Sequence, residues 1–200
     1  MISYKERQYL CWFLSVPGIG AVTGMRLFKQ FKSFEEIYNI EGKKLENAGL
    51  LRPKEAAAFD AEKCQLDRRK RELEELEKEG IRLIAFLDEN YPKRLLKIHD
   101  YPVGLFVRGE LPDEERSAAA VIGARNCTNY GKQEAEYMAA ELAKAGVQII
   151  SGLAYGIDSA GHRGALKAGG KTFGVLGCGI KICYPRENYG LYERICPFHL

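Results

Sequence analysis

The chain has 200 residues, 46% hydrophobic and 28% charged, and its 30 Lys and Arg against 27 Asp and Glu give a formal net charge of +3. This composition is that of a globular protein and excludes an intrinsically disordered chain, while the length allows one or two domains. No apolar run approaches the length of a membrane span. Because the charges nearly balance, any nucleic-acid site must be a local patch, and residues 121–200 carry nine Lys and Arg against six Asp and Glu.

The cysteines indicate a reducing compartment and no metal site. None of the six forms a Cys-x-x-Cys pair, and the chain holds only three histidines, so the sequence has no zinc-ligand spacing. Cysteines of this kind are typical of reduced thiols in a cytosolic protein. We therefore expect a cytoplasmic protein without a metal or other cofactor. The cysteines are Cys11, Cys64, Cys127, Cys178, Cys183 and Cys196.

The start of the chain predicts a helix-hairpin-helix. Apolar residues at helical spacing favour helices over residues 10–14 and 21–31, and the turn Val16-Pro-Gly-Ile-Gly20 joins them. In many DNA-binding proteins such a turn offers backbone N–H groups to a phosphate, and Arg26 and Lys29 are close in sequence. A packing turn between two core helices explains the same residues equally well.

The rest of the first 80 residues also predicts helices. Residues 34–51 favour a second small helical hairpin, and residues 55–79 favour one long charged helix. The basic run at residues 68–71 is best explained as a solvated face balanced by the acidic stretch that follows it. Gly80 ends the helix, so we expect an all-α domain of the helix-hairpin-helix or SAM-like type over residues 1–80 and a second domain over residues 81–200. The apolar residues at sevenfold spacing in the long helix are Phe59, Leu66 and Leu73.

The second half alternates strands and helices, which predicts an α/β domain with a Rossmann-like open parallel sheet. We expect strands at residues 82–87, 104–108, 118–123, 147–150 and 171–177. A helix between the third and fourth of these strands should turn one apolar face to the sheet and end at Gly146. The residues expected on that face are Ala135, Met138, Ala139 and Leu142.

A Gly-punctuated turn follows the strand at residues 147–150. Gly152 and Gly156 allow tight backbone turns, and Asp158 or Ser159 can cap the helix that begins there. The unpaired N–H groups of a first helical turn make an anion site.

We expect two more strands to end at the same rim, the edge of the sheet where the turn after residues 147–150 lies. Arg125 lies in the loop after the strand that ends at Gly123, where open α/β sheets bind ligands. We expect the next strand unit to bring Lys171 or Arg186 to this rim. Together these residues predict a phosphate-binding edge of the sheet.

Five linked segments resemble one known family, the DNA-processing protein A family (DprA, also called Smf). The resemblance implies a Rossmann-like domain that binds single-stranded DNA and helps to load the recombinase RecA onto it, chiefly in natural transformation. The sequence also has no P-loop, no metal cluster and no carboxylate in a recognisable catalytic turn, so we expect a protein that is not an enzyme. The segments are VIGAR with the later YG within residues 121–131, SGLAYGID from Ser151, AGHRGAL from Ala160, GKTFGVLGCG from Gly170 and YPRENYGLY from Tyr184.

The resemblance further implies which residues contact DNA. Gly123 and Arg125 match the family's Gly-Ser-Arg turn, in which Ala124 replaces Ser here. Arg186 and Tyr189 fall where the family places a basic residue and an aromatic that stacks on a base, a combination that suits single strands. The predicted DNA-binding residues are Gly123, Arg125, Ser151, Gly152, Gly156, Lys171, Arg186 and Tyr189.

The resemblance is expected to end near Ile195, before the segments with which the family completes its sheet, DNA pocket and dimer surface. We therefore expect a truncated chain with an incomplete sheet and an exposed edge. The homodimer of the family is not expected here, and binding of single strands should be weaker than in a full-length relative.

Two alternatives stay open. One is a nucleotide-processing enzyme with a Rossmann-like phosphate site, of the phosphoribohydrolase type, although the Pro-Gly-Gly-x-Gly-Thr turn of those enzymes is not in the sequence. Asp158 and His162 lie one helical turn apart, so a pair suited to proton transfer is geometrically possible. The other alternative is an inactive, truncated remnant.

Overall fold

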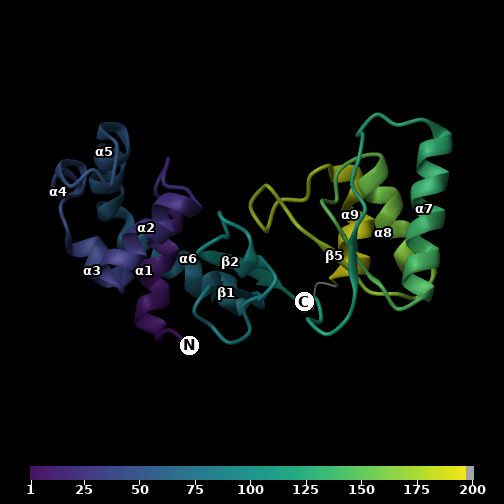
Figure 1. The fold of residues 1–200 in the computed structure, drawn as a ribbon, viewed down its shortest axis with the longest axis horizontal. Coiled ribbons are helices and arrows are strands. Elements are labelled where there is room, and N and C mark those ends of the chain that lie inside the picture. Colours follow the sequence, from purple (N-terminus) through teal and green to yellow (C-terminus); the bar gives the residue numbers. More distant parts are fainter. Residues whose placement is uncertain (197–200) are drawn as a thin grey trace. The chain divides into compact units, whose positions relative to one another are not determined.

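The computed structural model describes residues 1–196, and Figure 1 shows their fold. The chain divides into two compact units, Met1–Val107 and the part from Arg108 onward. Helices combine with a small parallel sheet, which confirms the predicted α/β class. Residues 197–200 lie outside the described part of the chain.

The first unit has helices in both segments where hairpins were predicted. α1 and α2 flank the turn at residues 16–20, whereas α3 packs against α1 and α2, and α4 packs against α5. The expected long helix is interrupted by the short 3-10 helix η1, so it consists of α5 and α6. The bounds are α1 Tyr4–Ser15, α2 Ala21–Phe31, α3 Phe34–Asn39, α4 Gly42–Asn47, α5 Pro53–Glu62, η1 Lys63–Gln65 and α6 Leu66–Lys78.

Aromatic residues fill the core of this unit. The Trp12 ring is fully buried and packs edge-on against Tyr38 and Phe59, with ring centroids 4.9 and 5.1 Å away. Leu66 and Leu73 are buried as well, so the sevenfold pattern marks the inner face of α5 and α6 as predicted. Such aromatic pairs stabilise a core by about 0.5–1.5 kcal/mol each beyond the area that they bury.

The basic run on α6 is engaged by acidic neighbours. Arg68 pairs with Glu72, and Arg69 pairs with both Glu62 and Glu72 at 2.6–2.7 Å. These contacts support the interpretation of the run as a charge-balanced helix face.

The strands β1 Ile81–Ala85 and β2 Gly104–Arg108 form a separate two-stranded sheet. Leu83 and Ala85 join the buried cluster of the helices, so these strands complete the core of the first unit. The boundary between the units consequently falls between Val107 and Arg108, whereas the sequence placed it at Gly80. The short 3-10 helix η2 Leu95–Lys97 lies between the two strands.

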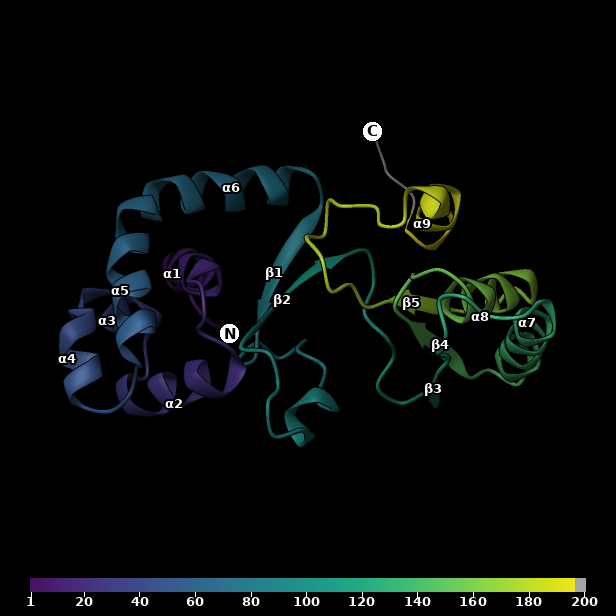
Figure 2. The same ribbon diagram turned by 90° about the horizontal axis from the view of Figure 1, so that it is seen from above.

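The second unit is built on a three-stranded parallel sheet of order β3-β4-β5. Ala119 of β3 pairs with Ile149 of β4, which pairs with Thr172 of β5. Helices α7 and α8 connect the strands and cover the same face of the sheet (Figure 2). Both β-α-β connections are expected to be right-handed and both move in the same direction across the sheet, so their helices fall on one face. The bounds are β3 Ala118–Ala120, α7 Asn129–Lys144, β4 Gln148–Ser151, α8 Ile157–Lys167, β5 Thr172–Gly174, η3 Arg186–Asn188 and α9 Tyr189–Ile195.

The inner face of α7 is narrower than the sequence predicts. Ala139 and Ala143 are buried, whereas Met138 is 59% exposed, so the prediction that Met138 faces the sheet is wrong. The reason lies in α8, where an added Cβ on Gly164 would come within 2.1 Å of the Glu136 carbonyl oxygen. Two helices this close leave room only for small side chains between them.

Within the described residues, no helix has both the length and the apolar character that crossing a membrane requires. The same part of the chain holds no group of His, Cys, Asp and Glu suited to a metal ion. All six cysteines are free thiols.

Candidate nucleic-acid interface

Three loops meet at the carboxyl-end edge of the β3-β4-β5 sheet. They comprise residues 121–128 after β3, residues 152–156 after β4 and residues 175–185 after β5. Because neighbouring strands lie about 4.8 Å apart, the outer two loops start about 10 Å from each other. We call this edge of the sheet the carboxyl rim.

One buried carboxylate joins the first two loops of the carboxyl rim. The Gly123 N–H donates to Oδ1 of Asp158 at 3.3 Å, and the Gly152 N–H donates to Oδ2 at 3.1 Å. The expectation that Asp158 or Ser159 caps α8 is therefore wrong, since the cap residue is Gly156 and it has no side-chain bond. The Ser159 hydroxyl donates instead to the carbonyl oxygen of Ala154.

Gly156 allows the second loop to touch the first. Its φ of +76° lies in the left-handed region, and an added Cβ would be 2.2 Å from the Ala124 carbonyl oxygen. The Ile157 N–H donates to that same oxygen at 3.3 Å. Arg125 is thus carried on a loop held firmly against the start of α8, and its side chain is exposed.

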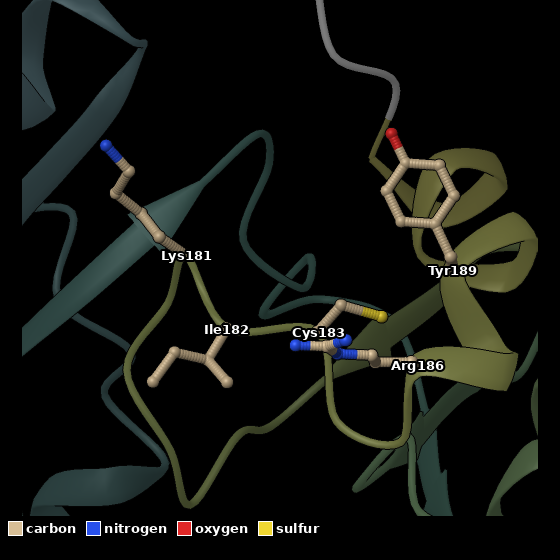
Figure 3. Close-up of a pocket in the computed structure, with 5 residues that line it drawn as sticks. All are labelled: Lys181, Ile182, Cys183, Arg186 and Tyr189. Carbon is tan, nitrogen blue, oxygen red and sulfur yellow. The ribbon is translucent and has the colours of Figure 1, made fainter.

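Arg186 and Tyr189 line one open pocket of about 520 Å³. Figure 3 shows both side chains extending from the η3–α9 segment, Arg186 toward Cys183 and Tyr189 away from the helix, while the other lining residues come from the loop after β5. The Tyr189 ring is 56% exposed. An exposed ring beside a guanidinium can stack on a base while the charge meets a phosphate. The lining residues are Lys181, Ile182, Cys183, Arg186 and Tyr189.

A buried asparagine that the sequence analysis missed positions this pocket. The Asn188 side-chain amide donates to the carbonyl oxygen of Leu153 at 2.8 Å and to Oγ of Ser159 at 2.9 Å. It therefore fixes η3, and with it Arg186, to the loop after β4. The segment YPRENYGLY contains this residue, but nothing in the sequence marks which of its polar side chains points inward.

Two further tyrosines extend the aromatic surface of the carboxyl rim. Tyr155 is 39% and Tyr184 is 57% exposed. The Tyr155 hydroxyl donates to Oε2 of Glu187 at 2.5 Å, and this hydrogen bond raises the pKa of the phenol and lowers the pKa of the carboxyl. Exposed and buried aromatics look alike in a sequence, which is why these two were not singled out.

Lys171 does not join the carboxyl rim, and the expectation that it does is wrong. It precedes Thr172, the first residue of β5, and therefore lies at the amino end of the sheet. Its ammonium group pairs with Glu110. Because Lys171 also begins the predicted strand, either strand start leaves it at the amino end, and only the residues after the strand reach the carboxyl rim.

Ser151 and His162 are both engaged inside the unit. The Ser151 hydroxyl is buried and donates to the carbonyl oxygen of Val121 at 2.5 Å. His162 is fully buried, with Nδ1 2.7 Å from Oγ1 of Thr172, and burial lowers its pKa to about 4. Since the Asp158 carboxylate accepts from Gly123 and Gly152, the structure favours a structural role for Asp158 and His162.

The hairpin of the first unit is more easily explained by packing. Arg26 donates to the carbonyl oxygen of Leu50, so its guanidinium is already engaged. An added Cβ on Gly18 would lie 3.6 Å from Cγ of Glu55, which places a carboxylate side chain against the turn.

A parallel sheet with basic and aromatic side chains along the carboxyl ends of its strands defines a Rossmann-like ligand-binding protein. Residues 82–199 match the family described as "DNA recombination-mediator protein A", and this match runs past Ile195, where the resemblance was expected to end. The chain therefore belongs to the DprA/Smf family.

Two relatives and one solved structure illustrate the similarity. The DNA processing protein DprA of Bacillus subtilis is 37% identical over 123 residues, which are 61% of this chain and 41% of that protein. Protein Smf of Synechocystis is 28% identical over 199 residues, or 98% of this chain and 50% of that protein. The X-ray structure of DprA from Streptococcus pneumoniae superposes with a TM-score of 0.69 at 29% identity, covering 94% of this chain and 64% of that one. The chain thus spans about half the length of the curated relatives that it matches.

Proposed function

We propose that the carboxyl rim binds single-stranded DNA without base preference. The observation that carries this proposal is the pocket that Arg186 and Tyr189 both line, on the same edge of the sheet as the loop that presents Arg125. Within residues 1–196, neither guanidinium forms a hydrogen bond or an ion pair. Both are therefore available for phosphate oxygens.

The aromatic residues favour single strands over duplex DNA. Stacking on Tyr189, Tyr155 or Tyr184 requires a base that is not already stacked and paired, which a single strand supplies at low cost. The net charge of +3 is too small for strong non-specific attraction to a duplex. The glycines of the carboxyl rim, among them Gly123 and Gly152, contribute to DNA binding by shaping the loops that carry the contacting side chains.

We further propose that the protein acts by binding and not by catalysis. The groups most suited to acid–base chemistry are engaged internally, because Asp158 holds two loop amides and His162 is buried against Thr172. The family description as a recombination mediator supports a role in handing single strands to a recombinase of the RecA type, in transformation or recombination. The matched part of this chain covers 41% of the Bacillus subtilis relative, so the handover is proposed and not carried over from it.

A binding titration tests the proposed function. Labelled oligothymidine and a duplex of equal length would be titrated with the full chain at two salt concentrations, with fluorescence anisotropy as the readout. We expect tighter binding of the single strand and weaker binding at higher salt, because phosphate contacts release counterions. Equal affinity for both DNAs, or an affinity that does not change with salt, would contradict the proposal.

A further inference from the structure

We infer that the Asp158 carboxylate is a built-in anion that fills the phosphate position of the carboxyl rim and thereby excludes free phosphate groups from it. In this role Asp158 determines which ligands the carboxyl rim accepts. A mononucleotide needs a backbone cradle for its terminal phosphate, whereas a DNA strand can be held by side chains at the surface.

The Asp158 carboxylate is held by the same kind of loop amides that hold a ligand phosphate in other open α/β sheets. Such sheets bind phosphates with the N–H groups of the loops that follow neighbouring strands, at the start of a helix. Here those N–H groups belong to Gly123 after β3 and Gly152 after β4, and each donates to a different oxygen of Asp158. One side chain therefore bridges two loops in the manner of a bound anion.

One further N–H group is engaged at this corner, where the loops after β3 and β4 meet the start of α8. The N–H of Ile157, the first residue of α8, donates to the Ala124 carbonyl oxygen. Asp158 itself is only 7% exposed, so its carboxylate belongs to the interior of the corner and not to its surface. An incoming phosphate would meet these three engaged N–H groups, of Gly123, Gly152 and Ile157, and a negative charge.

The glycine at position 152 is explained by the same contact. An added Cβ there would lie 2.7 Å from Oδ2 of Asp158, a distance that real Cβ atoms essentially never show. Glycine is therefore needed at this position to admit an internal carboxylate, whether or not a ligand approaches.

This inference bears on the proposed DNA site, because it assigns phosphate contacts to Arg125 and Arg186 and not to the loop amides. It does not depend on DNA binding. Its test uses inorganic phosphate alone, so a failure of the inference and a failure of the proposed function give different results.

The experiment compares the wild-type chain with Asp158→Ala and with the matched variant Asp113→Asn, which changes an exposed carboxylate outside the corner. Each protein is titrated with inorganic phosphate against chloride at equal ionic strength. NMR spectra follow the amide signals of Gly123 and Gly152, and thermal unfolding gives the midpoint temperature. We expect no saturable change in the wild type or in Asp113→Asn. In Asp158→Ala, which frees both donors and the space between them, we expect saturable shifts of both amide signals and a midpoint that rises by several degrees with phosphate.

Two results would overturn the inference. The first is a saturable shift of either amide signal in the wild type, which would show that the corner accepts phosphate with Asp158 in place. The second is a folded Asp158→Ala chain that responds to phosphate no more than to chloride. If Asp158→Ala is unfolded in both salts, the wild-type titration alone decides.

Discussion

The side-chain amide of Asn188 lies 2.8 Å from the carbonyl oxygen of Leu153, a residue whose own backbone is left-handed at a φ of +58°. Left-handed backbone is uncommon outside glycine and costs about 1–3 kcal/mol, so it persists only where the surroundings fix it. Asn188 provides such a constraint and also bonds to Ser159. The loop after β4 and the segment that carries Arg186 and Tyr189 are thus one connected structure.

Replacing Asn188 by Ala should weaken both stability and DNA binding. The Leu153 carbonyl oxygen would lose a buried donor, which costs about 1–3 kcal/mol in unfolding free energy. Urea unfolding followed by circular dichroism measures the loss, and anisotropy measures binding. Asn39→Ala, at an exposed position of α3, is the control and should change neither. An Asn188→Ala chain with unaltered stability would show that the segment is held by other contacts.

Arg125→Ala should lower the affinity for single-stranded DNA and its dependence on salt. With about one phosphate contact fewer, the slope of log affinity against log salt should shrink by about one unit. Lys171→Ala is the matched comparison, because this residue lies at the amino end of the sheet and pairs with Glu110. We expect it to leave affinity and slope unchanged. If the Lys171 variant loses as much as the Arg125 variant, the DNA path does not follow the carboxyl rim.

Tyr189→Ala should weaken single-strand binding, while Tyr189→Phe should bind like the wild type. Stacking contributes about 1–3 kcal/mol per base, and a phenyl ring stacks as well as a phenol. The comparison therefore separates stacking from hydrogen bonding by the hydroxyl group. Tyr137→Ala on α7 removes a ring of similar exposure, 63%, away from the pocket and should have no effect. Equal losses for the Phe and Ala variants would indicate that the hydroxyl group, and not the ring, makes the contact.

His162 should make the fold less stable as the pH falls. Burial lowers its pKa to about 4 from the ordinary value of 6.5, so between these values the unfolded chain binds a proton that the folded chain does not. Stability then rises with pH through this window, by about 3 kcal/mol in total, and the contribution is fully present above pH 6.5. His162→Gln cannot titrate, so its stability should change less between pH 6.5 and 4 in denaturant titrations. Parallel profiles for both chains would contradict the assignment.

The sequence predicted which segments form helices and strands better than it predicted where these begin and end or how their side chains pack. Strand–helix alternation identified the α/β unit, and the spacing of Phe59, Leu66 and Leu73 identified a buried helix face. Both are periodic signals that are local in the chain. The assignment of Met138 to the sheet failed because the closeness of α7 and α8 depends on Gly164, which is distant in sequence.

The site was predictable where it depends on strand ends and less so where it depends on side-chain direction. Arg125, Arg186 and Tyr189 are exposed on the carboxyl rim, as the motifs imply. Lys171 was assigned to the carboxyl rim although it begins the predicted strand, and in a parallel sheet only residues after a strand reach that rim. Asp158 was expected to be a cap because an acidic residue in a first helical turn commonly is one.

Amide mapping of the DNA path tests the central claim most directly. The full chain, labelled with nitrogen-15, would be titrated with a short oligothymidine, and the amide signals that shift would be assigned. We predict that the shifts concentrate in the loops after β3 and β5 and in η3, around Arg125, Arg186 and Tyr189. Shifts centred instead on Lys171 and Glu110, or on the turn at residues 16–20 of the first unit, would contradict the account.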